Sequence, residues 1–282
     1  MTRRHLIRTI SASACCAAFS DLLPAVGPQS IDAQLAKLGA TVELFWKNIA
    51  SVSCTERMEQ LKVDPEKDKV LNSRTATYDY LVLLQMLGSE FRVEESRQLL
   101  SESKRKKIKR PSHRPLLITN GFALALLMFH PRYQPSFAFR SLEAEDQNGR
   151  EYSRIAFEHI RGEDSPSALM LDDRLYPLQW KGEVWVDPSS GQIARLHTEL
   201  SEPLSEVGLE RLEAEVEYAA IELSATTLWM PLSARIEAAS KRQLWRNSHE
   251  FTDYQQFQVE TDFKIEDIEE PPATLAPDPG QH

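Results

Sequence analysis

The 282-residue sequence contains few cysteines and few glycines, and these shortages exclude several kinds of site. Its three cysteines form no Cys-x-x-Cys spacing, and no His-Glu-x-x-His zinc pattern occurs. Its ten glycines build neither a phosphate-cradling loop nor a Gly-x-Ser-x-Gly nucleophile turn. The sequence therefore predicts no cofactor, no metal ion and no catalytic residue.

The residues that could carry chemistry have simpler interpretations. Ser101 and Lys104 match the Ser-x-x-Lys pattern of serine acyl-transfer enzymes, but the partner motifs of those enzymes are missing. The histidines of the predicted strands, His159, His197 and His249, are expected to be scattered over the surface. A lone Cys54 is expected to be a small buried apolar residue.

The chain also lacks an excess of positive charge. Its net charge of -9 argues against nucleic acid as a partner, because binding to phosphates needs a broad basic face. One basic run interrupts this pattern, and residues 101–114 are predicted to form a solvated loop. The alternative is contact with an acidic partner or an anionic membrane surface. The basic residues concerned are Lys104, Arg105, Lys106, Lys107, Lys109 and Arg110.

No apolar run reaches the length of about 20 residues that spans a bilayer. The longest, residues 121–129, predicts a short buried helix that Pro131 ends. Residues 1–27 resemble an export signal, with arginines before a small-residue run, and their start is similar to the twin-arginine pattern. Lipidation at Cys15 or Cys16 is the less favoured alternative. The protein is therefore expected in the periplasm or cell envelope.

Periodicity predicts the remaining elements. Apolar residues of the segment 31–49 recur every three or four positions, which indicates one helix with Ser30 as its N-cap. Residues 180–200 alternate in polarity around the turn 187–191 (DPSSG) and predict a hairpin. Similar alternation recurs up to residue 265, and residues 266–282 have the composition of a disordered acidic tail.

These patterns predict an α+β fold that is mainly β. We expect one domain, residues 28–265, with a strongly curved antiparallel sheet of about ten strands forming an incomplete barrel. Such a meander tends to curl and one face must be covered. Two or more helices are therefore expected to pack in the concave side.

At this point the chain resembles the periplasmic lipoprotein-carrier superfamily, which includes the outer-membrane lipoprotein sorting proteins. The resemblance covers roughly residues 31–265. It is carried by residues 182–187 (GEVWVD) and 193–196 (IARL), which are similar to the Trp-Ile-Asp, turn, Pro/Val-x-Arg hairpin of that family. The resemblance implies an incomplete barrel that holds an acyl chain or hydrophobic peptide between sheet and helices, without catalytic residues.

Three functions remain open. The first is a non-enzymatic envelope protein that binds a lipid, a lipoprotein acyl chain or a hydrophobic peptide in the concave sheet. The second is an envelope structural or protein-interaction module with a filled core, and the third is a hydrolase with an unrecognised site. For the first, alternation predicts these lining residues: Phe122, Leu126, Met128, Phe137, Phe139, Val184, Val186, Leu196, Val216, Met230 and Leu232.

Overall fold

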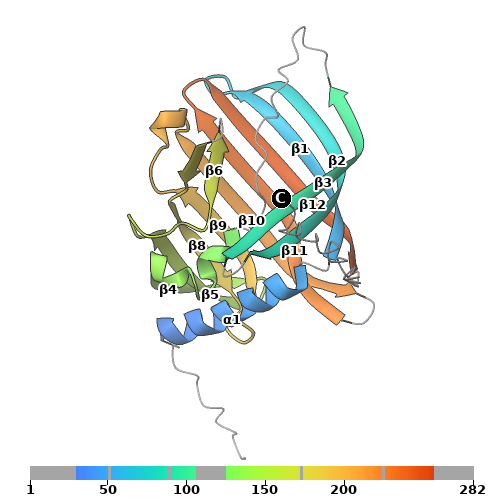
Figure 1. The fold of residues 1–282 in the computed structure, drawn as a ribbon. Helices are drawn as coiled ribbons and strands as arrows, with labels where there is room; N and C mark the ends of the chain where they lie inside the picture. The colour runs from blue at the N-terminus through green and yellow to red at the C-terminus, as the bar shows by residue number, and fades with distance from the viewer. Residues whose placement is uncertain are drawn as a thin grey trace, which may run out of the picture.

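The computed structural model describes residues 30–49, 52–87, 90–105, 125–171, 174–223 and 226–256. Ten strands form one open, strongly curved antiparallel sheet in the order β3-β2-β1-β12-β11-β10-β9-β8-β5-β4, and β6 and β7 pair separately (Figure 1). The strands are β1 (Val52–Asp64), β2 (Lys69–Leu87), β3 (Glu90–Arg105), β4 (Phe137–Gln147), β5 (Arg150–His159), β6 (Ala168–Leu171), β7 (Arg174–Pro177), β8 (Trp180–Val186), β9 (Ile193–Leu200), β10 (Arg211–Leu223), β11 (Thr226–Ser240) and β12 (Gln243–Gln256).

The predicted curved antiparallel sheet is confirmed, and so is the helix at its predicted bounds. Helix α1 (Ile31–Ile49) begins where the Ser30 hydroxyl accepts a hydrogen bond from the Ala33 amide at 3.3 Å. Asp32 in its first turn and Lys47 in its last turn complement the helix dipole.

One helix, rather than two or more, is present in the part of the chain that the structure describes. The apolar segment near residue 125 forms the 3-10 turn η1 (Leu126–Phe129), and its start at residues 121–124 lies outside the described residues. All four residues of η1 are buried. Two further 3-10 turns, η2 (Gln134–Ser136) and η3 (Ser205–Val207), were not predicted.

The core lies between the sheet and these helical segments. The α1 residues Leu38, Val42 and Phe45 belong to one buried cluster with η1 and with inward residues of β5 and β8 to β11. A smaller cluster around Leu200 and Leu212 lies farther along the sheet, where Leu169 of β6 packs against it. The apolar face of the sheet is therefore covered by side chains over most of its described length.

The prediction of a polar loop at residues 101–114 is wrong for residues 101–105. Strand β3 continues to Arg105 because its backbone pairs with β2 up to the Ser73 and Arg105 pair. The sequence suggested a loop since the segment is strongly polar, but β3 is an edge strand, where charged residues are well tolerated. Residues 106–120 lie outside the described part of the chain.

The hairpin at the centre of the sequence is confirmed, and its two faces differ as predicted. Val184 and Val186 are buried in the core. Trp185 faces the other way, and the Arg195 guanidinium covers its ring at 3.7 Å from the centroid, so that the indole is only 7% exposed. Its Nε1–H donates to Glu145 at 2.9 Å. The outer face of this hairpin is thus closed by charged side chains.

Candidate functional site

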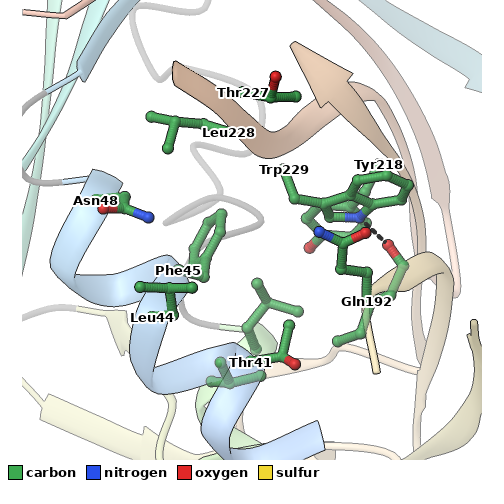
Figure 2. Close-up of a pocket in the computed structure, with 12 residues that line it drawn as sticks. Thr41, Leu44, Phe45, Asn48, Gln192, Tyr218, Thr227, Leu228 and Trp229 are labelled. Carbon is green, nitrogen blue, oxygen red and sulfur yellow. Dashed lines mark hydrogen bonds between the residues drawn. The ribbon is translucent and has the colours of Figure 1, made fainter. Parts of the chain in front are cut away.

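An apolar pocket of about 80 Å³ lies beside the C-terminal half of α1 (Figure 2). Leu44 stands at its rim with a 57% exposed side chain, and Phe45 reaches into the wall. The pocket is lined by Thr41, Val42, Leu44, Phe45, Asn48, Leu126, Gln192, Ile193, Tyr218, Thr227, Leu228 and Trp229. It therefore joins the helix to η1 and to the facing ends of β9, β10 and β11.

The helical spacing of the sequence creates one wall of this pocket. Thr41, Leu44, Phe45 and Asn48 stand three, four and seven positions apart, which places them along one side of α1. Phe45 belongs to the apolar stripe that packs on the core, and the other three residues border this stripe. This side of α1 therefore serves the core and the pocket together.

Strand ends supply the opposite wall. The Trp229 indole Nε1–H donates to the carbonyl of Ile193, which ties β11 to the start of β9. The Tyr218 ring meets Phe45 edge-on, with centroids 6.4 Å apart. Burial raises the pKa of Tyr218, so this phenol stays neutral at physiological pH. The wall is thus uncharged, and two of its side chains, Tyr218 and Trp229, are aromatic.

The size of the pocket limits what enters it. An apolar cavity of about 150 Å³ holds a benzene molecule. The pocket measures roughly half of that, which suits a short aliphatic group or the end of a chain. A complete acyl chain needs displacement of α1 or of the side chains beneath it.

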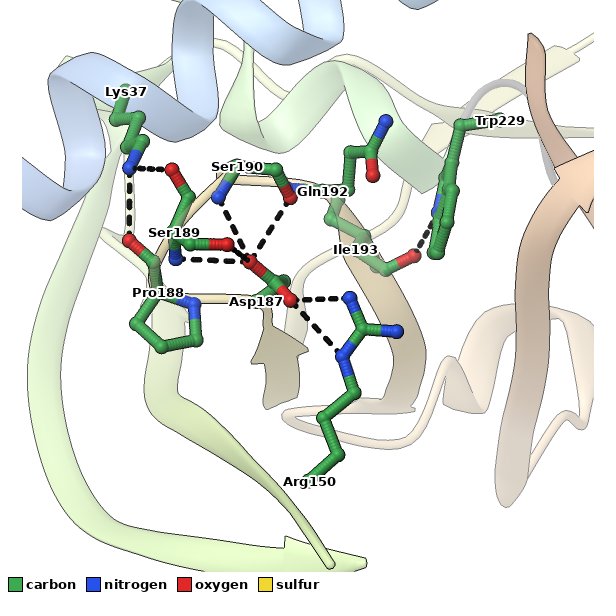
Figure 3. A network of polar contacts seen from close by, with 9 residues as sticks. All are labelled: Lys37, Arg150, Asp187, Pro188, Ser189, Ser190, Gln192, Ile193 and Trp229. Carbon is green, nitrogen blue, oxygen red and sulfur yellow. Dashed lines mark hydrogen bonds and ion pairs between the residues drawn. The ribbon is translucent and has the colours of Figure 1, made fainter. Parts of the chain in front are cut away.

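The N-terminal half of α1 is fastened to the turn between β8 and β9 (Figure 3). Lys37 Nζ donates to the carbonyl oxygens of Pro188, at 2.8 Å, and Ser189. The Thr41 hydroxyl lies 3.4 Å from the Ser190 carbonyl oxygen. Three successive carbonyl groups of the turn thus face the helix, and they fix the end of α1 opposite to Leu44.

Asp187 shapes this turn from inside. Its Oδ1 accepts from the backbone amides of Ser189 and Ser190 at 2.9 and 2.8 Å, and its Oδ2 forms an ion pair with Arg150. Burial opposes ionisation, but the hydrogen bonds from the two serines and Arg150 outweigh it and lower the pKa of Asp187 far below its usual value. The turn is therefore preset to receive Lys37.

A second polar group is buried where β1 meets β12. The Glu56 carboxylate, which is fully buried, lies 2.7 Å from Nδ1 of His249 and 2.6 Å from Nε of Arg97. Burial disfavours the charged form, but the hydrogen bonds from His249 and Arg97 have the larger combined effect and lower the pKa of Glu56. An ionised carboxylate only accepts, so Nδ1 of His249 carries the proton.

This cluster contradicts the expectation of surface histidines. His249 is 4% exposed and His159 is 7% exposed. The pairing of Met58 with His249 in the sheet directs the imidazole onto the same buried face as Glu56. The reason is the twofold alternation of β12, which places position 249 inward together with Phe251.

Among the described residues, Cys54 is a poor nucleophile and no cluster of metal-ligating side chains occurs. Burial, followed by the nearby Glu56, raises the pKa of the Cys54 thiol to about 12, which opposes formation of a thiolate. No group of three or more potential metal ligands occurs in the described part of the chain. Among the same residues, no helix is both long and apolar enough to cross a membrane.

Most of the predicted lining residues come together, but few of them line the pocket. Leu126, Met128, Phe137, Val184, Val186, Leu196, Val216 and Met230 are buried in the main cluster, and Phe139 packs against it. Leu126 alone among them also borders the pocket. Leu232 is 40% exposed because it is the extra residue of a β-bulge, between the pairs of Pro231 and Ser233. Phe122 lies outside the described residues.

Sequence reasoning missed both walls of the pocket and the buried cluster. The sequence did contain a signal for the helical wall of the pocket, since Thr41, Leu44 and Asn48 flank the apolar stripe of the helix. A signal existed for Glu56 as well, because it shares the inward alternation of Cys54 and Met58. No local pattern marked Arg97, whose contact with Glu56 depends on the pairing of three strands.

Comparisons with known proteins identify similar folds only. No family model matches the chain, and no curated protein matches it. A solved domain assigned as an outer membrane lipoprotein-sorting protein from Vibrio parahaemolyticus is similar, with a TM-score of 0.40 and 10% identity over 82% of this chain and 95% of that one. A DUF1329 family protein from Desulfovibrio piger has a TM-score of 0.42 and 9% identity, over 83% of this chain and 96% of that one.

The lipoprotein LppX from Mycobacterium tuberculosis is a third similar structure, with a TM-score of 0.28 and 12% identity over 83% of this chain and 100% of that one. One of these structures is described as an outer membrane lipoprotein-sorting domain, the kind of protein that the sequence resembles. Because every one of these TM-scores is below 0.5, no ligand and no residue role is transferred to this chain.

Proposed function

We propose that this is an exported cell-envelope protein that binds a hydrophobic group without catalysis. The group belongs to a lipid, a lipoprotein acyl chain or a hydrophobic peptide. The observation that carries the proposal is the apolar pocket beside α1, with Leu44 at its rim and an uncharged wall opposite that includes Tyr218 and Trp229. Concave apolar pockets with few polar groups are the usual form of sites for such ligands.

The attachment of α1 supports the same function. Lys37 and Thr41 donate to carbonyl groups of the turn between β8 and β9 and hold the helix against the sheet. These polar contacts fix the position of the helix, whose residues Thr41, Leu44 and Asn48 form one wall of the pocket.

The test is a fluorescence titration of the delipidated protein with dansyl-undecanoic acid. Leu44→Asn places a polar amide at the rim and is expected to weaken binding at least fivefold. Ala40→Asn changes an exposed residue one turn earlier on α1, outside the pocket, and is expected to leave the affinity unchanged. Equal affinities of both variants and the parent protein, or no binding by any of them, contradict the proposal.

A second candidate function is an envelope interaction or structural module with a filled core. The observation that favours it is the dense buried cluster of the main sheet, beside which the pocket is small. Lipid extraction and mass spectrometry of protein purified from the cell envelope separate the two candidates. A co-purifying lipid supports the first, and its absence together with a failed titration supports the second.

The contact of the basic run with an anionic membrane stays a prediction. Strand β3 includes Lys104 and Arg105, and the other four basic residues lie outside the described part of the chain. Binding to vesicles that contain anionic lipid, and its loss at high salt, tests this prediction.

A further inference from the structure

Strands β11 and β12 separate close to the pocket. The last backbone pair that joins them is that of Ser233 and Glu250. Beyond this pair, within the described residues, β11 pairs only with β10, and β12 pairs only with β1. A seam therefore runs between residues 226–232 of β11 and residues 251–256 of β12.

The sequence explains why the two strands separate here. Leu232 is the extra residue of the β-bulge in β11, and Asp253, with a φ of 53°, lies in a second bulge in β12. A bulge bends its strand and interrupts the pairing. Pro231, next to the first bulge, has no N–H to donate to a neighbouring strand. Both strands are thus diverted at the same level of the sheet.

The side chain of Tyr254 bridges the seam. Its hydroxyl donates to the carbonyl oxygen of Pro231 at 2.5 Å, and the Cys54 thiol is a further hydrogen-bond partner. Burial raises the pKa of Tyr254, so the phenol stays neutral and remains a donor. The ring packs against the main apolar cluster, to which Met230 and Phe251 on the two sides of the seam belong. The inward face of the seam is therefore apolar and is closed by Tyr254.

The seam starts at a wall of the pocket. Residues 227–229 line the pocket and belong to the part of β11 that borders the seam (Figure 2). Tyr218, another lining residue, pairs with Pro231. The carbonyl of Pro231 in turn holds the hydroxyl of Tyr254. The pair of Tyr218 and Pro231 therefore stands between the pocket and Tyr254.

We propose that the ligand is a single unbranched aliphatic chain, that a chain longer than the pocket continues into the seam, and that Tyr254 determines the chain length. This inference rests on the proposed function and names its ligand class. The pocket of about 80 Å³ takes the end of one such chain. An aliphatic chain brings no polar group that needs a partner on the apolar inward face of the seam, whereas each peptide unit brings two.

Tyr254 yields more readily than the helix that covers the pocket. It stands two positions before the end of β12, and its displacement breaks its hydrogen bonds with Pro231 and Cys54. Displacement of α1 would expose several buried apolar side chains and break the contacts of Lys37 with the turn between β8 and β9. Space for a longer chain is therefore gained at Tyr254, while α1 stays in place.

Displacement of dansyl-undecanoic acid by octanoic and hexadecanoic acid tests the role of Tyr254. Tyr254→Ala opens the seam and is expected to lower the dissociation constant of hexadecanoic acid at least fivefold, whereas that of octanoic acid changes less than twofold. Tyr254→Phe keeps the ring and removes only the hydroxyl, so it serves if the alanine variant folds poorly. It is expected to act in the same direction, at least twofold. Tyr176→Ala, the same truncation on β7 and outside the pocket, is expected to change neither value.

A photoreactive probe locates the chain in the unaltered protein. Hexadecanoic acid with a diazirine at its methyl end is expected to label Met230, Phe251 or Tyr254, as identified by mass spectrometry. Labelling confined to α1 and residues 227–229 overturns the inference. Equal effects of both Tyr254 variants on the short and the long acid, or no effect on either, overturn it as well.

Two further outcomes separate this inference from the proposed function. A parent protein that binds neither the dansyl probe nor the acids overturns both. Displacement of the bound probe by an apolar decapeptide, but by neither acid, overturns the aliphatic chain as ligand and leaves the pocket as a binding site.

Discussion

His249 donates its Nδ1 proton to Oε1 of Glu56 across 2.7 Å, although 193 positions of the chain separate the two residues. The pairing of β1 with β12 brings them together, and Arg97 reaches the same carboxylate from β3. A buried charge is tolerated when it is paired and hydrogen-bonded. The carboxylate of Glu56 therefore joins the other two residues, and its removal takes the same counter-charge from both.

The first prediction concerns Glu56. Glu56→Leu takes the counter-charge from the partly buried guanidinium of Arg97, and the free energy of unfolding is expected to fall by about 3 kcal/mol. Combining it with Arg97→Met and His249→Leu replaces the whole cluster by apolar side chains and is expected to cost less than the single change. Urea denaturation followed by tryptophan fluorescence measures both. A single variant that loses less than about 1 kcal/mol contradicts the dependence.

The second prediction concerns acid. The pKa of Glu56 is lower in the folded protein than its ordinary value of 4.5, so folding favours the ionised form. The stabilisation that the ionised Glu56 contributes is complete above the pKa that this group has in the unfolded chain. It is lost as the pH falls through the lower pKa of the folded protein. The pKa of Asp187 is shifted in the same direction. Unfolding free energies are therefore expected to decrease below about pH 4.5, and less steeply in Glu56→Gln. If the unfolding free energies of the variant and the parent protein fall equally with decreasing pH, Glu56 does not contribute to the acid sensitivity.

The third prediction compares two glycines with the same backbone conformation. Gly191 and Gly149 have φ angles of 78° and 79°. A Cβ at position 191 lies 2.9 Å from Cγ of Lys37, whereas at position 149 it meets nothing within 4 Å. Gly149→Ala is expected to lower the free energy of unfolding by about 1 kcal/mol, because of the positive φ alone. Gly191→Ala is expected to lower it by about 2 to 3 kcal/mol.

The additional cost at position 191 arises because α1 must move from the turn. Hydrogen exchange of the α1 amides is therefore expected to be faster in Gly191→Ala and unchanged in Gly149→Ala. Equal losses of stability in the two variants mean that the contact between α1 and the turn contributes nothing.

Alternation and helical periodicity are local properties, and they determined the architecture of this protein. The apolar stripe of residues 31–49 requires a helix with one buried side, and the alternation around residues 187–191 requires a hairpin. Such patterns also place Val184 inward, because a slip of one residue would expose the whole apolar face. The curved antiparallel sheet follows from repeated hairpins and from their twist.

Only the tertiary structure decided which distant residues meet. Arg97, Glu56 and His249 stand on three strands whose neighbours are set by the order of the sheet, and no local spacing encodes that order. Strand β3 exists because β2 offers it backbone partners, which outweighs the polar composition that predicted a loop. The pocket likewise forms where α1 crosses the ends of β10 and β11, and its volume depends on the packing of side chains from separate elements.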